Sequence, residues 1–121
     1  MAMSETVPGV GVQELFGKLR DGAVLVDVRE SYEFVEVRAT GARLVPLATV
    51  PDRLGEFPID RVVYVICKSG GRSAQACQFL RANGVDAVNV LGGTLAWVDA
   101  ELPVEVGEPM DSSGSANETS H

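Results

Sequence analysis

The sequence predicts an α/β protein built on a parallel β-sheet with helices on both faces. Its 121 residues suit one domain with one core. Helix-like and strand-like segments alternate along the chain, as is typical of parallel sheets with crossover helices. Residues 62–67 are continuously apolar instead of alternating, as expected of a strand covered on both faces. We therefore expect this strand to be central.

The first half of the chain alternates between predicted helices and strands. Residues 12–20 have apolar side chains at positions 12, 15, 16 and 19, the spacing of one helix face. The short apolar run at 24–28 is bounded by Gly22 and a charged pair, as in a strand. The pattern continues with a helix at 31–37, a strand at 43–47, a short helix at 52–57 that Pro58 ends, and the strand at 62–67.

The second half contains a helix with both ends marked. Residues 73–83 place Cys77 and Leu80 on one face. Ser73 is a candidate N-cap, and Gly84 is the expected residue after the helix. The remaining predicted elements are a strand at 88–91, a turn at Gly92-Gly93 and a helix at 94–101 that Pro103 ends.

Both ends of the chain are predicted to be disordered, because residues 1–9 and 107–121 hold too few apolar side chains to bury. The folded domain is therefore expected at residues 10–106. The net charge is −7, and the acidic, serine-rich C-terminal segment contributes to it without any Lys or Arg. Because no basic cluster is present, we expect no nucleic-acid partner.

The residue types exclude several kinds of chemistry. His121 is the single histidine and lies in the polar tail, so mechanisms that need a positioned imidazole are excluded. The two cysteines form no CxxC pair and have no histidine partner, so we expect no metal and no cofactor. We see no leader-like segment and no apolar run of the ~18 residues that a membrane span needs. The expected location is the cytoplasm, with no membrane partner.

The candidate active site is the loop that follows the buried strand. Cys67 ends the strand, and Gly70-Gly71 allow backbone N–H groups to converge in front of a helix N-terminus. Lys68 and Arg72 add positive charge, and such surroundings can lower a cysteine pKa from ~8.5 to well below 7. The alternative is that Cys67 is a small apolar residue at a strand end. The candidate loop residues are Lys68, Ser69, Gly70, Gly71, Arg72 and Ser73.

The loop resembles that of the rhodanese family, which reads Cys-x-x-Gly-x-Arg-Ser and is matched by Cys67, Gly70, Arg72 and Ser73. Further segments that look like family signatures lie, in chain order, at 25–30 with 32–34, at 40–42 with 45–47, and at 92–97. The resemblance covers roughly residues 10–104 and implies a rhodanese-like domain, a five-stranded parallel sheet with helices on both faces.

The resemblance also implies an activity. In that family the cysteine accepts a sulfane sulfur from thiosulfate or from a persulfide or polysulfide, and passes it to a thiol, to cyanide or to a protein acceptor. Carried over, Cys67 is the nucleophile, the backbone N–H groups of residues 68–72 cradle the persulfide, and Lys68 holds the donor's anionic leaving part. Attack by a low-pKa thiolate on divalent sulfur needs no general base.

Two alternatives stay open. Phosphatases of the same fold place five residues between cysteine and arginine, whereas four separate Cys67 from Arg72, which indicates a smaller anion site suited to one sulfur atom. A phosphatase is therefore the second hypothesis. A non-catalytic binding module with this fold is the third, because inactive members commonly lack the cysteine that this chain keeps.

Residues outside the loop are expected to support it. Asp27, Arg29 and Glu33 are predicted to form an ion-pair network with Arg72, and Trp97 to pack beneath the site. Cys77 is predicted to be a core residue and not a resolving thiol. One segment departs from the family pattern: residues 37–39 read Val-Arg-Ala where the family has Gly-His-Ile, which could alter the local loop or a partner surface.

Overall fold

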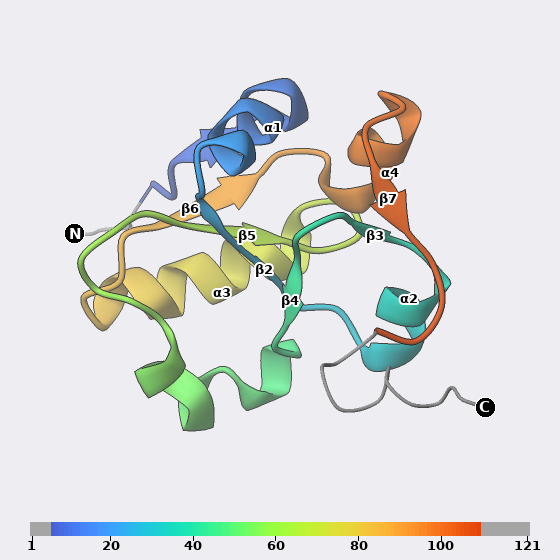
Figure 1. Cartoon of the computed structure of the whole chain (residues 1–121). Coiled ribbons are helices and arrows are strands. Elements are labelled where there is room, and N and C mark those ends of the chain that lie inside the picture. The colour runs from blue at the N-terminus through green and yellow to red at the C-terminus, as the bar shows by residue number, and fades with distance from the viewer. Residues whose placement is uncertain (1–5, 110–121) are drawn as a thin grey trace.

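The computed structural model describes residues 6–109, and Figure 1 shows a sheet with helices packed on its two faces. The sheet has five parallel strands in the order β1-β6-β5-β2-β4, which confirms the predicted fold class. The strands are β1 (Gly9–Val10), β2 (Val24–Asp27), β4 (Arg43–Leu44), β5 (Val63–Ile66) and β6 (Ala87–Val90). As predicted, the continuously apolar strand β5 lies in the middle.

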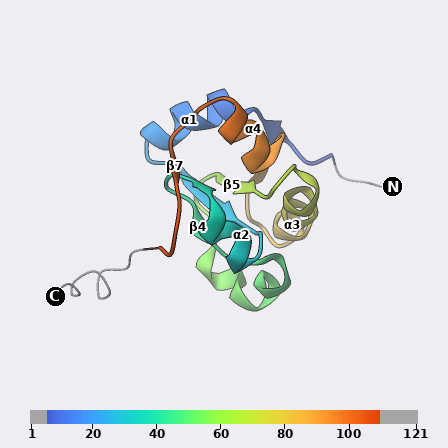
Figure 2. The ribbon, with the colours of Figure 1, turned by 90° about the vertical axis from the view of Figure 1, so that its right-hand side faces the viewer.

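Helices cover both faces of the sheet, as Figures 1 and 2 show. One face carries α1 (Val12–Arg20) and α4 (Gly93–Asp99), and the other carries α3 (Gly71–Ala82) with two 3₁₀ helices at Leu47–Thr49 and Pro51–Glu56.

The burial of strand β5 on both faces explains why apolar and polar residues do not alternate in its sequence. Val63 and Val65 belong to the core on the α3 side, whereas Tyr64 and Ile66 belong to the core on the α1 and α4 side. Successive side chains of a strand point to opposite faces, so a strand with helices on both faces needs an apolar residue at every position.

Helix α2 (Ser31–Glu36) lies at the carboxyl edge of the sheet, directly after β2. Its start is a capping box, in which the Glu30 side chain accepts from the backbone of Glu33 and the Glu33 side chain accepts from the Glu30 N–H at 2.9 Å. This cap satisfies N–H groups that the first helical turn leaves free, and it fixes the Glu33 carboxylate near the loop that follows β5.

The start of α3 differs from the prediction. The helix begins at Gly71, and its N-cap is Gly70 in the left-handed region with φ of 117°, not Ser73. Glycine adopts this conformation without the steric cost that a Cβ would bring. Ser73 therefore lies inside the first turn, where its hydroxyl is free to bind elsewhere. Gly84 follows the helix with φ of 90°, as predicted.

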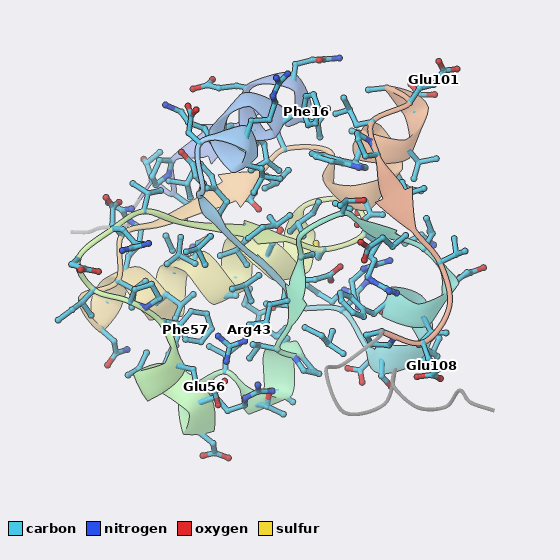
Figure 3. The ribbon with its side chains drawn as sticks, in the orientation of Figure 1. Phe16, Arg43, Glu56, Phe57, Glu101 and Glu108 are labelled. Atoms are coloured by element: carbon cyan, nitrogen blue, oxygen red, sulfur yellow. The ribbon has the colours of Figure 1, made fainter. Side chains whose placement is uncertain are left out.

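Strand β4 is shorter than the predicted strand at 43–47. The regular strand is Arg43–Leu44, and the Val45 N–H still donates to Asp27 O at 2.9 Å. Pro46 has no N–H to donate and leads into the first 3₁₀ helix. Figure 3 shows Arg43 and Glu56 lying together, and their side chains form an ion pair. This pair links the edge strand to the second 3₁₀ helix.

A small antiparallel pair was not predicted. Strand β3 (Arg38–Ala39) pairs with β7 (Val104–Glu105), far along the chain. Arg38 is 5% exposed, lies 4.7 Å from the Phe34 ring centroid, and donates to the backbone oxygens of Phe34 and Gly107. Arg38, the residue that replaces a histidine of the resembling family, is thus buried and binds the C-terminal segment. It is not part of an exposed partner surface.

The described residues extend past both predicted domain bounds. Gly9 lies in β1, and the Asn89 N–H donates to Pro8 O at 2.8 Å. The Gly107 N–H donates to Val35 O at 2.7 Å. Disorder is therefore wrong for these end residues. The rest of the prediction, for residues 1–5 and 110–121, lies outside the described residues. Within residues 6–109, no helix is long and apolar enough to span a membrane.

Candidate active site

The loop after β5 is held tightly from one side. Cys67 is 1% exposed and comes directly after the strand. The Thr94 N–H and hydroxyl both donate to the Cys67 carbonyl, at 2.8 and 3.0 Å. A Cβ on Gly93 would lie 2.5 Å from Lys68 O and 2.6 Å from Cys67 O, so only glycine allows α4 to approach this closely. The backbone below the cysteine is therefore fixed.

The sulfur of Cys67 accepts hydrogen bonds from the loop. The Gly70 N–H lies 3.1 Å from Sγ, and the Ser73 hydroxyl lies 3.2 Å from it. Burial opposes ionisation of the thiol, but the hydrogen bonds from the Ser73 side chain and from the backbone of Ser73, Gly70 and Ser69 together hold the Cys67 pKa below its ordinary value. Donors of the loop and of the first turn of α3 therefore face the Cys67 sulfur, and binding of an anion by this loop stays a prediction. The principal causes of the lowered Cys67 pKa are hydrogen bonds and not the charges of Lys68 and Arg72.

Arg72 is paired with α2 instead of facing the sulfur. Its two terminal nitrogens donate to the two carboxylate oxygens of Glu33 at 2.8 and 2.9 Å. The hydrogen bonds from Arg72 are the largest influence on Glu33 and lower its pKa to about 2, despite the opposing effect of burial. The same bonds raise the pKa of Arg72. This bridge ties the first turn of α3 to the capped start of α2.

Asp27 and Arg29 form a second, separate pair. Arg29 donates from Nε and Nη2 to the Asp27 carboxylate at 2.8–3.1 Å, and both side chains are buried. Arg29 also donates to Val37 O at 2.8 Å. The predicted four-residue network is therefore two pairs: Glu33 holds the loop, whereas Asp27 and Arg29 hold the chain that follows β2 to the end of α2.

A pocket of about 530 Å³ opens beside the loop, at the carboxyl edge of the sheet between α2 and α4. Lys68 is exposed and lines this pocket. Its other exposed lining residues include Tyr32, Glu36, Leu95, Val98 and Asp99. The pocket thus offers the ammonium group of Lys68, the carboxylates of Glu36 and Asp99 beside the Arg72-bound carboxylate of Glu33, and an apolar wall.

Trp97 lies in the core and away from the loop's sulfur. It is 1% exposed, packs edge to face on Phe16 of α1 with ring centroids 6.1 Å apart, and donates from Nε1 to Pro103 O at 2.7 Å. Phe16 is labelled in Figure 3, on the side of α1 that faces α4. Trp97 therefore packs α4 against α1.

Cys77 is fully buried on α3, and burial raises its pKa to about 12. These surroundings agree with the predicted core role. Among the described residues, no cluster of histidine, cysteine and acidic side chains suits a metal ion.

Asn89 is a site residue that the sequence reasoning missed. It is 7% exposed on β6, and it contacts both residues that donate to the sulfur. Its Oδ1 accepts from the Ser73 hydroxyl at 2.5 Å, and its Nδ2 donates to Gly70 O at 3.3 Å. The available signal was a polar residue inside a short apolar strand, but its partners depend on β6 lying next to β5.

Comparisons with known proteins agree with this geometry. The sequence matches the rhodanese-like domain family over residues 12–100. A protein of Allochromatium vinosum named sulfurtransferase is 38% identical over 85 residues, which cover 69% of this chain and 79% of that protein. The thiosulfate sulfurtransferase GlpE of Glaesserella parasuis serovar 5 is 34% identical over 107 residues, 87% of this chain and 99% of that protein.

A solved structure agrees as well. The rhodanese-like domain protein from Staphylococcus aureus is 36% identical, covers 84% of this chain and 100% of its own, and has a TM-score of 0.76. Other curated relatives are longer than the matched region, which covers 60% of one and 48% of another. Because the family match spans most of the chain, from α1 through the Cys67 loop to α4, the protein belongs to the rhodanese-like domain family.

Proposed function

We propose that this protein is a sulfurtransferase that carries sulfane sulfur as a persulfide on Cys67. The observation that carries the proposal is the sulfur itself: Cys67 Sγ accepts from the Gly70 N–H and the Ser73 hydroxyl at the end of β5, and its pKa is lowered. The relatives named sulfurtransferases support the general activity.

The reaction has two displacement steps. The Cys67 thiolate attacks the outer, divalent sulfur of the donor, and the donor's S–S bond breaks. With thiosulfate the leaving group is sulfite, which keeps the electron pair, and the product is an anionic Cys67 persulfide. An acceptor thiolate or cyanide then attacks the outer sulfur, and Cys67 leaves as a thiolate. The lowered pKa makes Cys67 a better leaving group in this second step.

Neither step requires a proton from a side chain. The chain has no histidine within the described residues, and the groups that contact Sγ are a backbone N–H and a hydroxyl. A phosphate ester, by contrast, needs a general acid to protonate its leaving oxygen. The groups that contact the sulfur include no such acid, and the short spacing of four residues between Cys67 and Arg72 also favours sulfur transfer over the phosphatase alternative.

The pocket beside the loop suggests two kinds of substrate. Lys68 is suited to the anionic part of thiosulfate or of a persulfide donor. The exposed side chains of Tyr32, Leu95 and Val98 on the same pocket suit the carbon skeleton of a thiol or a protein acceptor. We therefore propose a small sulfur donor, with a thiol, cyanide or a protein as acceptor.

The test compares the two cysteines. Intact mass after incubation with thiosulfate or polysulfide is expected to show one added sulfur atom on the wild type and on Cys77→Ser, but none on Cys67→Ser. Thiocyanate release with cyanide should follow the same order. The same preparations are assayed with a small aryl phosphate. Phosphate release that depends on Cys67, without sulfur transfer, would refute the proposal, and inactivity on both substrates would favour a binding module.

A further inference from the structure

The hydroxyl of Ser73 lies between two acceptors. It is 2.5 Å from Asn89 Oδ1 and 3.2 Å from Cys67 Sγ. All three side chains are buried, with Ser73 fully buried, so water does not replace a missing partner easily. A serine hydroxyl has one proton, and it therefore donates to only one of these two acceptors at a time.

The orientation of the Asn89 amide follows from its other partner. Gly70 O can only accept, so the Asn89 atom 3.3 Å from it is the NH₂ group. Oδ1 then faces Ser73, and Oδ1 can only accept. The Ser73 hydroxyl is therefore the donor that this buried amide oxygen has in the structure.

Two arrangements of protons result. When Cys67 is a thiol, its S–H can donate to Ser73 Oγ while the hydroxyl donates to Asn89 Oδ1, and every group has a partner. When Cys67 is a thiolate, the hydroxyl turns to Sγ, and Asn89 Oδ1 loses its donor. A buried acceptor left without a donor has a free-energy cost. Asn89 therefore favours the uncharged sulfur.

We propose that Asn89 is a positioning residue that competes with the Cys67 sulfur for the single hydroxyl proton of Ser73. The proposal rests on Cys67 being the reactive group of the proposed function, but not on which donor loads it. In the persulfide, the negative charge lies on the outer sulfur and no longer on Sγ. The Ser73 hydroxyl then donates to Asn89 Oδ1 again. Asn89 thus makes the free Cys67 thiolate less stable relative to the thiol and the persulfide.

Asn89 has a second contact, to Gly70 O, which also holds the loop. Its loss on substitution would act in the opposite direction, because a looser Gly70 N–H stabilises the thiolate less. A single substitution therefore mixes two effects. A double-mutant cycle with Ser73 separates them, since only the competition for the proton passes through Ser73.

The cycle also keeps the charged surroundings constant. The titratable and charged groups on the elements around Cys67 are Lys68 in the loop, Arg72 and Cys77 on α3, Asp27 and Arg29 at and after the end of β2, Tyr32, Glu33 and Glu36 on α2, and Asp99 on α4. All of them are present in the wild type, in Asn89→Ala, in Ser73→Ala and in the double variant. Their effect on the Cys67 pKa therefore cancels in the comparison.

The experiment measures the pKa of Cys67 in these four proteins, from the rate of iodoacetamide alkylation against pH, with peptide mass to assign the site. The measured quantity is the shift in the Cys67 pKa that Asn89→Ala causes, first in the wild type and then in Ser73→Ala. The shift in the wild type is expected to be lower, towards acid pH, by about half a unit than the shift in Ser73→Ala. Below the pKa this corresponds to about threefold more thiolate. Asn89→Leu, which fills more of the space, repeats the cycle if the alanine variant unfolds.

Equal shifts in both backgrounds would overturn the proposal, because Asn89 would then act only through Gly70. A pKa that rises only in the wild-type background would also overturn it, since Asn89 would then merely hold the serine in place. Alkylation does not depend on sulfur transfer. A coupled pKa shift in a protein that fails to load sulfur would therefore support Asn89 and refute the proposed function.

Discussion

The two cysteines of this chain are both buried, yet their surroundings act in opposite directions. Burial raises the pKa of Cys77 to about 12, because α3 offers its sulfur an apolar core. Cys67 experiences burial as well, but the hydrogen bonds from Ser73 and Gly70 outweigh it and lower the pKa. The comparison teaches that burial alone makes a cysteine inert, and that donors aimed at the sulfur make it reactive.

The largest expected effect is a difference in alkylation rate. Near neutral pH, Cys67 in the folded protein is expected to react with iodoacetamide about a thousandfold faster than Cys77, because their pKa values differ by several units and Cys77 is inaccessible. Peptide mass after timed quenching measures both rates. In denaturant the two rates should become similar. Faster labelling of Cys77 in the folded protein would reverse the assignment of roles.

The next effect is on stability at high pH and concerns Cys77. Its folded pKa is raised, so its contribution is fully present below the unfolded pKa of ~8.5 and is lost as the pH rises toward 12. Between pH ~9 and ~11 the wild type is expected to lose roughly 2 kcal/mol more than Cys77→Ala. Urea unfolding of both proteins at several pH values measures this. Parallel losses would show that Cys77 is not kept neutral by the fold.

A smaller effect is expected at the bridge that positions the Cys67 loop. Glu33→Gln removes the ionic pairing with Arg72 and should cost about 1 kcal/mol, a value kept small because the bridge is partly exposed. The pKa of Glu33 is lowered, so its contribution is present above its ordinary pKa of 4.5 and is lost as the pH falls toward about 2.

Thermal unfolding of Glu33→Gln and wild type from neutral to acid pH tests this, and the two curves should converge at the acid end. The control is Glu56→Gln, which removes two more exposed ion pairs, with Arg43 and Arg53, away from the loop. If the deficit of Glu33→Gln were the same at every pH, the ionised carboxylate would not be the cause.

The smallest effect is expected at Lys68. Lys68→Ala should leave stability unchanged, because the side chain is exposed, and should slow sulfur loading from thiosulfate a few-fold at low salt. High salt screens the interaction and should shrink the defect. Loading rates at two salt concentrations measure it, with Lys18→Ala as the control for a surface lysine on α1. An unchanged rate at low salt would make Lys68 a solubilising charge only.

Local sequence determined the frame of this protein. The alternation of helical and strand-like segments, and the uninterrupted apolar run of β5, predicted a parallel sheet with helices on both faces. Periodicity is a local property, and each element carries its own, so no knowledge of neighbours was needed. The loop after Cys67 was also readable, because its glycines and its place between a strand and a helix are local features.

Contacts between distant segments depended on the tertiary structure. The sequence placed Arg72 with Asp27, Arg29 and Glu33 in one network, but the fold divides them into two pairs. Likewise, nothing local shows that Arg38 reaches the backbone of Gly107 across the β3 and β7 pair. Such contacts require the strand order and the path of the chain end, which periodicity does not specify.

Inside the site, the contacts of Asn89 and Ser73 also depended on the tertiary structure. Ser73 was interpreted as a helix cap, but Gly70 takes that position, so the serine hydroxyl points at the sulfur and the amide. Asn89 lies opposite Val65 in the parallel ladder, which turns both side chains toward α3. Residue types alone predicted that Cys67 is reactive. The contact between the Asn89 amide and the Ser73 hydroxyl was decided by the tertiary structure. It requires strand β6 to lie beside β5, because only that pairing brings the amide within reach of Ser73.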